Sequence, residues 1–198
     1  MTAPVAGASL AAWRKAAIER MERSREATLR FLARLPEGEL LRPRTQGRWS
    51  IKDVLAHFAA WEEEAIRRFA LIVRGRGERI FFYDRDPKAV DRFNARAVAA
   101  ARSLGLGGVL RRLHRVRRRL VERLRRLPAA SLRDRAHRYP VTAWLPEYAW
   151  THEQHHLRWL RRWWKGRRAE PGGGSGERRR TRQRATRGSG AAGRPGGP

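Results

Sequence analysis

The sequence predicts an all-α protein, a four-helix bundle, on three observations. Apolar residues recur at helical spacing in four segments of the first 165 residues. Capping residues or prolines stand where these segments begin. No segment shows the strict alternation of apolar and polar residues that a half-buried strand requires. Four apolar stripes are buried most simply against one another, and we therefore expect a bundle.

The first two segments begin at good N-caps. Ser9 precedes a helix that we expect to run to about Arg34. Ser50, with Asp53 three residues later, matches a capping box, in which each side chain accepts from a backbone N–H of the other. The helix that follows carries a continuous apolar stripe and should end at Gly75.

The last two segments contain helix-breaking residues. The third helical region should begin near Pro87, and the glycines in 104–108 predict a break or kink within it. A regular leucine stripe follows. We expect the fourth helix to run from about Trp144 to Trp164, with Pro146 in its first turn.

Length and composition indicate one domain. We expect residues 1–165 to form the bundle and residues 166–198, rich in Arg and Gly, to be a disordered tail. There is no cysteine, so disulfides and thiolate ligands are excluded. We see no apolar run near the roughly 20 residues that span a bilayer and no signal peptide, so we expect no membrane partner and a cytoplasmic location.

The formal net charge of +27 attracts polyanions. Of the 46 basic residues only 4 are Lys, a bias that a GC-rich coding background would give whatever the partner. A nucleic-acid partner, bound non-specifically through the basic tail, therefore stays an alternative prediction.

The histidines are the candidate chemistry. His152 and His156 are spaced i, i+4 on the apolar stripe of the fourth helix, so both should face the interior. His57, at the edge of the second helix's stripe, can join them if these helices are neighbours. Three imidazoles would suit a divalent Zn, Ni or Fe ion. The alternative is core-edge histidines, each paired with a carbonyl or a Glu.

Other residues are candidates for a surrounding pocket. His155 is one position off the main line and is predicted to be a pocket wall, while Glu153 could orient a ligand imidazole. Trp61 and Trp159 are either core or an aromatic wall. We expect the acidic run 62–64 on an exposed face, pairing with Arg67 and Arg68, expect His114 to be solvated, and assign His137 no role.

Three segments carry a family resemblance. WSIKDVLAHFAAWEE (49–63), DRFNARAV (91–98) and YAWTHEQHH (148–156) resemble the DinB-like superfamily, and most nearly its ClbS/DfsB-type branch. The likeness extends over about residues 9–165. It implies an up-down-down-up bundle with a long crossover between the second and third helices, and bundles that often dimerise.

The resemblance also implies a function. The family's three-histidine divalent site maps to His57, His152 and His156, and Asn94 matches a recurring position with a structural or substrate-facing role. Family members include thiol-dependent transferases and isomerases, and the nearer branch includes a hydrolase of a reactive cyclopropane. We therefore expect a metal-dependent hydrolase or transferase for a small electrophilic molecule, of a detoxification or stress type. A non-catalytic basic bundle that binds nucleic acid or an acidic partner is the alternative.

Overall fold

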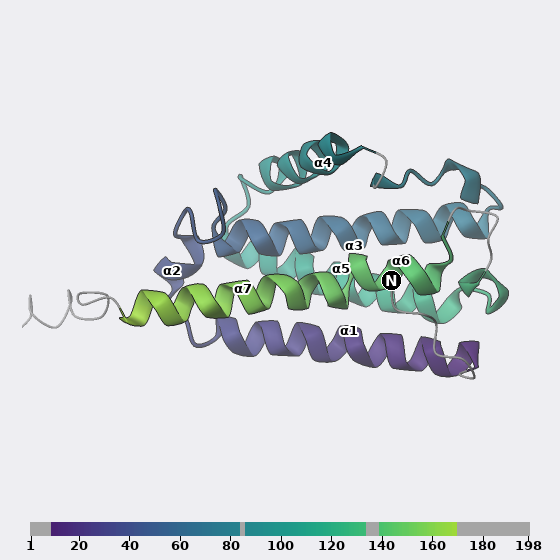
Figure 1. Cartoon of the computed structure of the whole chain (residues 1–198), viewed down its shortest axis with the longest axis horizontal. Coiled ribbons are helices and arrows are strands. Elements are labelled where there is room, and N and C mark those ends of the chain that lie inside the picture. The colour runs from purple at the N-terminus through teal and green to yellow at the C-terminus, as the bar shows by residue number, and fades with distance from the viewer. Residues whose placement is uncertain (1–8, 84–85, 134–138, 170–198) are drawn as a thin grey trace, which may run out of the picture. The chain divides into compact units, whose positions relative to one another are not determined.

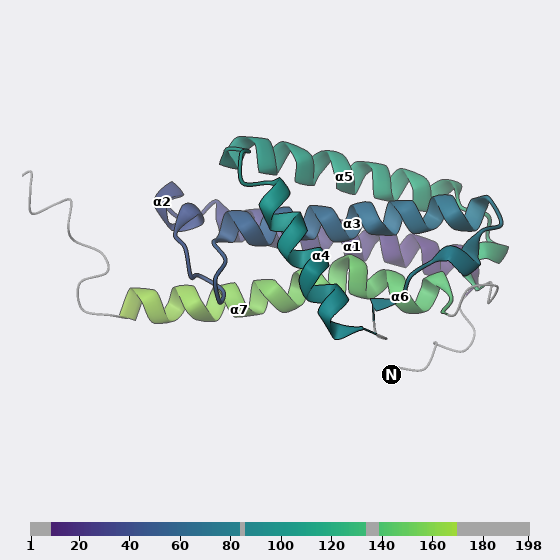
Figure 2. The same ribbon diagram turned by 90° about the horizontal axis from the view of Figure 1, so that it is seen from above.

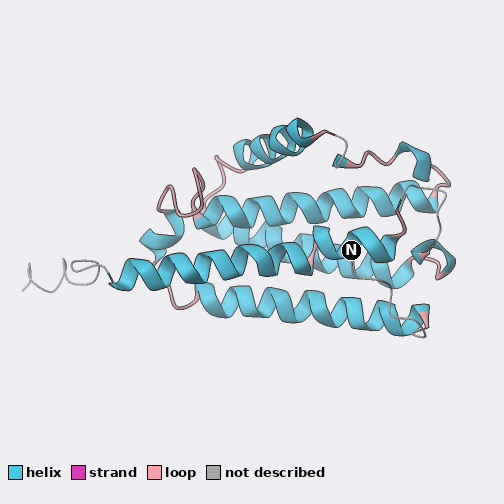
Figure 3. Ribbon diagram, viewed as in Figure 1, coloured by secondary structure: helices cyan, strands magenta, loops and turns pink. Residues whose placement is uncertain are grey.

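The computed structural model describes residues 9–83, 86–133 and 139–169, and this part of the chain is helical with no strand (Figure 3). Its α-helices are α1 (Leu10–Leu32), α2 (Glu37–Leu41), α3 (Ile51–Val73), α4 (Pro87–Ala100), α5 (Leu106–Arg126), α6 (Val141–Tyr148) and α7 (Trp150–Ala169). Two short 3-10 helices, η1 (Gly77–Arg79) and η3 (Ala130–Leu132), follow α3 and α5. The predicted all-α class is confirmed.

The chain divides into two compact units, Met1–Leu160 and Arg161–Pro198. The described part of the second unit is the end of α7, where the rings of Trp163 and Trp164 lie 5.9 Å apart. Helix α7 continues to Ala169, so the first four residues of the predicted tail, 166–169, are helical. Residues 170–198 of that predicted tail lie outside the described residues.

The long helices of the first unit lie lengthwise beside one another (Figures 1 and 2). In the colours of Figure 1, α1 runs from right to left, α3 and α5 run from left to right, and α6 returns from right to left. Helix α4 lies obliquely across α3. It returns the chain from the end of α3 to the opposite end of the bundle, where α5 begins. The order of directions is the one that the resemblance implies, and α4 forms the crossover.

The predicted caps set where the helices begin. The Ser9 side chain accepts from the backbone N–H of Ala12, and Ser50 and Asp53 form both bonds of the capping box. These bonds satisfy N–H groups that the first turn of a helix leaves without partners. At α4, Asp86 accepts from the backbone N–H of Ala89.

The core lies where α1, α3, α5 and α6 meet. Its most completely buried side chains include Met21, Phe69, Leu120, Leu124 and Leu145, each at most 1 % exposed. These residues come from the apolar stripes of the sequence, and complete burial of each contributes about 1.5–3 kcal/mol. Helix α3 packs against α4, α5 and α6, and its His57 lies with the two histidines of α7.

The third helical region is two helices, because the chain leaves helical geometry between Ala101 and Gly105, and the break predicted there is confirmed. The structure differs from the prediction in two places. The expected linker after α1 contains the short helix α2. The expected fourth helix is also divided: Ala149 has φ −128° and ψ −101°, which separates α6 from α7. Apolar spacing continues across this break, so the pattern did not reveal it.

Among the described helices, none combines the length and the apolar character that crossing a bilayer would need.

Candidate metal centre

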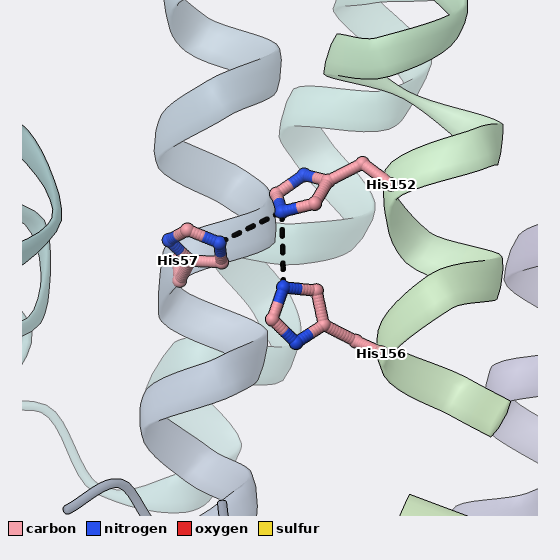
Figure 4. Close-up of side chains that lie close together, drawn as sticks. All are labelled: His57, His152 and His156. Atoms are coloured by element: carbon pink, nitrogen blue, oxygen red, sulfur yellow. Dashed lines mark hydrogen bonds between the residues drawn. The ribbon is translucent and has the colours of Figure 1, made fainter. Parts of the chain in front are cut away.

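Three histidines meet between α3 and α7 (Figure 4). Nε2 of His152 lies 2.8 Å from Nε2 of His57 and 3.1 Å from Nε2 of His156. One ring nitrogen from each residue lies within 4.8 Å of one from each other residue. His57 is buried, at 3 % exposure, and the other two side chains are partly buried. The structure thus brings together the three residues that the sequence singled out.

The two contacts of His152 do not both fit ordinary hydrogen bonds. A ring nitrogen carries either one N–H or one lone pair, so a single Nε2 forms one well-aligned hydrogen bond. Here the same atom lies within 3.1 Å of two nitrogens from different residues. Three lone pairs that converge on one ion would remove this conflict. With metal–nitrogen bonds of about 2.0–2.1 Å, tetrahedral ligands lie roughly 3.3 Å apart, close to the separations found here.

Burial keeps these imidazoles neutral, the state in which they bind a metal. Burial, with the neighbouring imidazoles, lowers the pKa of His57 to about 2 and that of His152 to about 3. The same two causes, with burial the larger, lower the pKa of His156 to about 4. All three side chains therefore present lone pairs at neutral pH.

A residue that we did not predict completes the cluster. Oε1 of Gln46 lies 2.8 Å from Nδ1 of His156, so the imidazole donates this hydrogen bond to the carboxamide. Gln46 lies in the loop before α3, next to Gly47, whose φ of +60° is in the left-handed region that favours glycine. No sequence signal marks it, because the bond joins residues 110 positions apart.

Aromatic side chains surround the histidines. The rings of Trp49 and Phe58 have centroids 4.8 and 6.2 Å from that of His57, and Trp61 lies 6.1 Å from His152. Trp61 also contacts three further rings, which come from the segment before α4, from α4 and from α6: Tyr83, Phe93 and Tyr148. Its indole N–H donates to Oδ1 of Asn94 at 3.0 Å. Trp61 and Asn94, both pocket candidates, thus lie together beside the histidines.

A buried ionic cluster joins four helices of the bundle, and two of its members follow His57 and His152 closely in the sequence. It consists of one residue each from α1, α3, α5 and α7: Arg25, Glu62, Arg117 and Glu153. The contacts are 2.5–2.8 Å long, and all four side chains are at most 7 % exposed. Two cations and two anions balance. Burial alone would raise the pKa of Glu153, but Arg25 and Arg117 hold it below its usual value.

This cluster corrects two predictions. Glu153 does not contact an imidazole among the described residues; its carboxylate binds two arginines. The acidic run is also not an exposed face, because Glu62 is 1 % and Glu64 is 7 % exposed. The predicted pairing of Glu64 with Arg67 and Arg68 is present, at 2.7 and 3.1 Å. Local periodicity missed the burial because the compensating charges of Glu62 come from other helices.

The remaining candidates lie further out. His155 is exposed, with its ring 5.9 Å from that of His156, and Trp159 is partly buried on the same helix. His114 is exposed on α5, as predicted for a solvated side chain. His137 lies outside the described residues.

Comparison with known proteins identifies the family. A sequence profile described as the DinB superfamily matches residues 20–160, which include all three histidines, Gln46 and Asn94. Searches among curated proteins and among solved structures found no match. The match extends over well more than half of the chain. The chain therefore belongs to the DinB superfamily.

Proposed function

We propose that His57, His152 and His156 hold a divalent metal ion, and that the protein is a metal-dependent enzyme. The observation that carries the proposal is the convergence of three neutral imidazole nitrogens, with Nε2 of His152 in contact with the other two. Proteins of this superfamily commonly bind a metal. No carboxylate belongs to the set, and Zn, Ni or Fe would suit imidazole ligands.

Three histidines leave coordination positions open, which is typical of catalytic rather than structural sites. When bound, such an ion supplies Lewis acidity, which activates a nucleophile or stabilises a leaving group. The protein's own residues would keep the metal ligands neutral and shield them from water. The imidazoles stay neutral because they are buried, and the rings of Trp49, Phe58 and Trp61 limit the access of water to them.

We propose hydrolase or thiol-dependent transferase chemistry on a small electrophilic molecule. The three sequence segments that resemble the ClbS/DfsB-type branch support this, together with the aromatic side chains around the histidines. A cytoplasmic location and a homodimer belong to the same proposal.

The test is metal analysis of the purified protein and of its variants. We expect about one equivalent of metal in the wild type and its loss in H152A. His114 is exposed and is not a member of the cluster, so H114A is the matched control and should keep the metal. Stoichiometric metal in H152A would refute the site. If the metal is present, turnover of electrophile panels with and without added thiol separates the hydrolase from the transferase.

A second candidate function has one observation in its favour. Five exposed arginines on α5 form no ion pair with any acid that the structure describes: Arg111, Arg115, Arg118, Arg119 and Arg123. Such a face suits a polyanion such as nucleic acid. Binding that falls steeply with salt and is abolished by R111E/R115E would support it. Binding lost only on deletion of residues 170–198 would assign it to the tail.

A further inference from the structure

The histidine cluster is carried by α3 and α7, but the side chain of Gln46 reaches it from the loop before α3. A carboxamide oxygen has lone pairs only, so its contact of 2.8 Å with His156 requires the proton to be on Nδ1 of that imidazole. A neutral imidazole has one N–H. Nε2 of His156, 3.1 Å from Nε2 of His152, is therefore left with a lone pair that faces the other histidines.

The loop that carries Gln46 is held by its own hydrogen bonds. The backbone N–H groups of Thr45 and Gln46 both donate to the carbonyl of Trp49, at 2.8 and 3.0 Å, and the N–H of Trp49 donates back to the Gln46 carbonyl at 3.0 Å. The hydroxyl of Thr45, a residue with 0 % exposure, donates to the carbonyl of Arg42 at 2.8 Å. None of these bonds uses the Gln46 carboxamide.

The same loop also reaches a second member of the cluster. The ring of Trp49 lies 4.8 Å from the ring of His57, centroid to centroid. The loop thus contacts a histidine of α3 through Trp49 and a histidine of α7 through Gln46. Neither contact is needed to close the loop, which points to a role at the histidines.

We propose that Gln46 is a positioning residue of the metal centre, which holds His156 in the Nδ1–H tautomer so that Nε2 can bind the ion. This inference rests on the proposed function. When one ring nitrogen of an imidazole binds a metal, a hydrogen-bond acceptor at the other nitrogen fixes both the tautomer and the orientation of the ring. Carboxylates and carbonyls are the usual partners, and the neutral carboxamide of Gln46 does this without adding charge.

The first test uses the metal-free protein and nitrogen NMR of its histidine rings. We expect His156 of the wild type to carry its proton on Nδ1, and expect Q46A to show a mixture of both tautomers. Gln154 is an exposed glutamine on the same helix, between the two ligand histidines, so Q154A is the matched control and should leave the spectrum unchanged. A wild-type protein with the proton on Nε2 of His156 would overturn the proposal.

The second test measures Zn²⁺ affinity by competition with a chelator. Loss of the outer partner should weaken binding about 10–100-fold in Q46A. The carboxylate of Q46E accepts the same bond and should restore the affinity, which a merely structural role would not predict. Q154A should bind as the wild type does. Equal affinities of Q46A and wild type would overturn the role of Gln46 alone, whereas a wild type that binds no metal would overturn the metal centre as well.

Discussion

The indole N–H of Trp61 donates to Oδ1 of Asn94 at 3.0 Å, and this bond joins α3 to the crossover helix α4. Trp61 follows His57 by one helical turn, and their rings lie 6.2 Å apart. Asn94 lies within the residues that the family profile matches, and this bond gives it a structural role. It holds α4 against the side of α3 that carries His57.

Loss of this bond should destabilise the protein. In N94A the indole N–H of Trp61, a residue only 8 % exposed, has no acceptor, and an unsatisfied buried donor costs about 1–3 kcal/mol. Urea unfolding measures this loss. The cycle of N94A, W61F and the double variant isolates the bond, because W61F removes the donor. Additive effects in that cycle would show that the bond contributes nothing.

The ionic cluster should be far more sensitive than ion pairs at the surface. R117M removes one cation of the buried set and leaves Glu62 and Glu153 with Arg25 alone. Breaking a buried ion pair in this way costs about 3–5 kcal/mol. Arg23, which pairs with Glu19 while 65 % exposed, provides the control, and R23M should change stability by less than about 1 kcal/mol. Chemical unfolding of both variants makes the comparison, and similar small losses would mean that the cluster is dispensable.

The histidine cluster and the buried ionic cluster differ in how far the sequence predicts them. His152 and His156 lie on one face of one helix, so their spacing alone brings them together, and a good cap fixes where the helix of His57 begins. Gln46 was missed, and Glu62 and Glu153 were assigned the wrong surroundings, because their partners lie 36 to 128 residues away. Periodicity assigns charged residues to the surface, and only the folded arrangement of the helices supplies the opposite charges.

The stability of the metal-free protein should fall as the pH drops below about 6.5. The histidines have pKa values of about 2, 3 and 4 when folded, against 6.5 for the free side chain, so the unfolded state binds more protons in this range. Stability therefore rises with pH between about 4 and 6.5, by up to roughly 1.4 kcal/mol per pH unit for each histidine.

Unfolding of the metal-free protein at pH 7 and pH 5 measures this dependence. Replacing a buried histidine, as in H57Q, should make the dependence shallower, and H114Q should not, because His114 is exposed. Glu153, whose pKa is lowered, adds a loss of stability only below the ordinary carboxyl pKa of 4.5. A stability that does not change between pH 7 and pH 5 would contradict the burial of neutral imidazoles.

The backbone of the Gln46 loop should also affect metal binding. Gly47 has φ +60°, where a side chain costs about 1–2 kcal/mol, although a Cβ there would meet no atom within 4 Å. G47A should therefore lower stability and, by displacing the adjacent Gln46, weaken Zn²⁺ binding. Gly38 in α2 has equally open space but no positive φ, so G38A is the matched control and should leave both quantities unchanged or improve stability. If G47A loses stability but binds Zn²⁺ as the wild type does, the carboxamide of Gln46 reaches His156 even from a distorted loop. If G47A loses both stability and Zn²⁺ affinity, the conformation of Gly47 is needed to place Gln46 at His156.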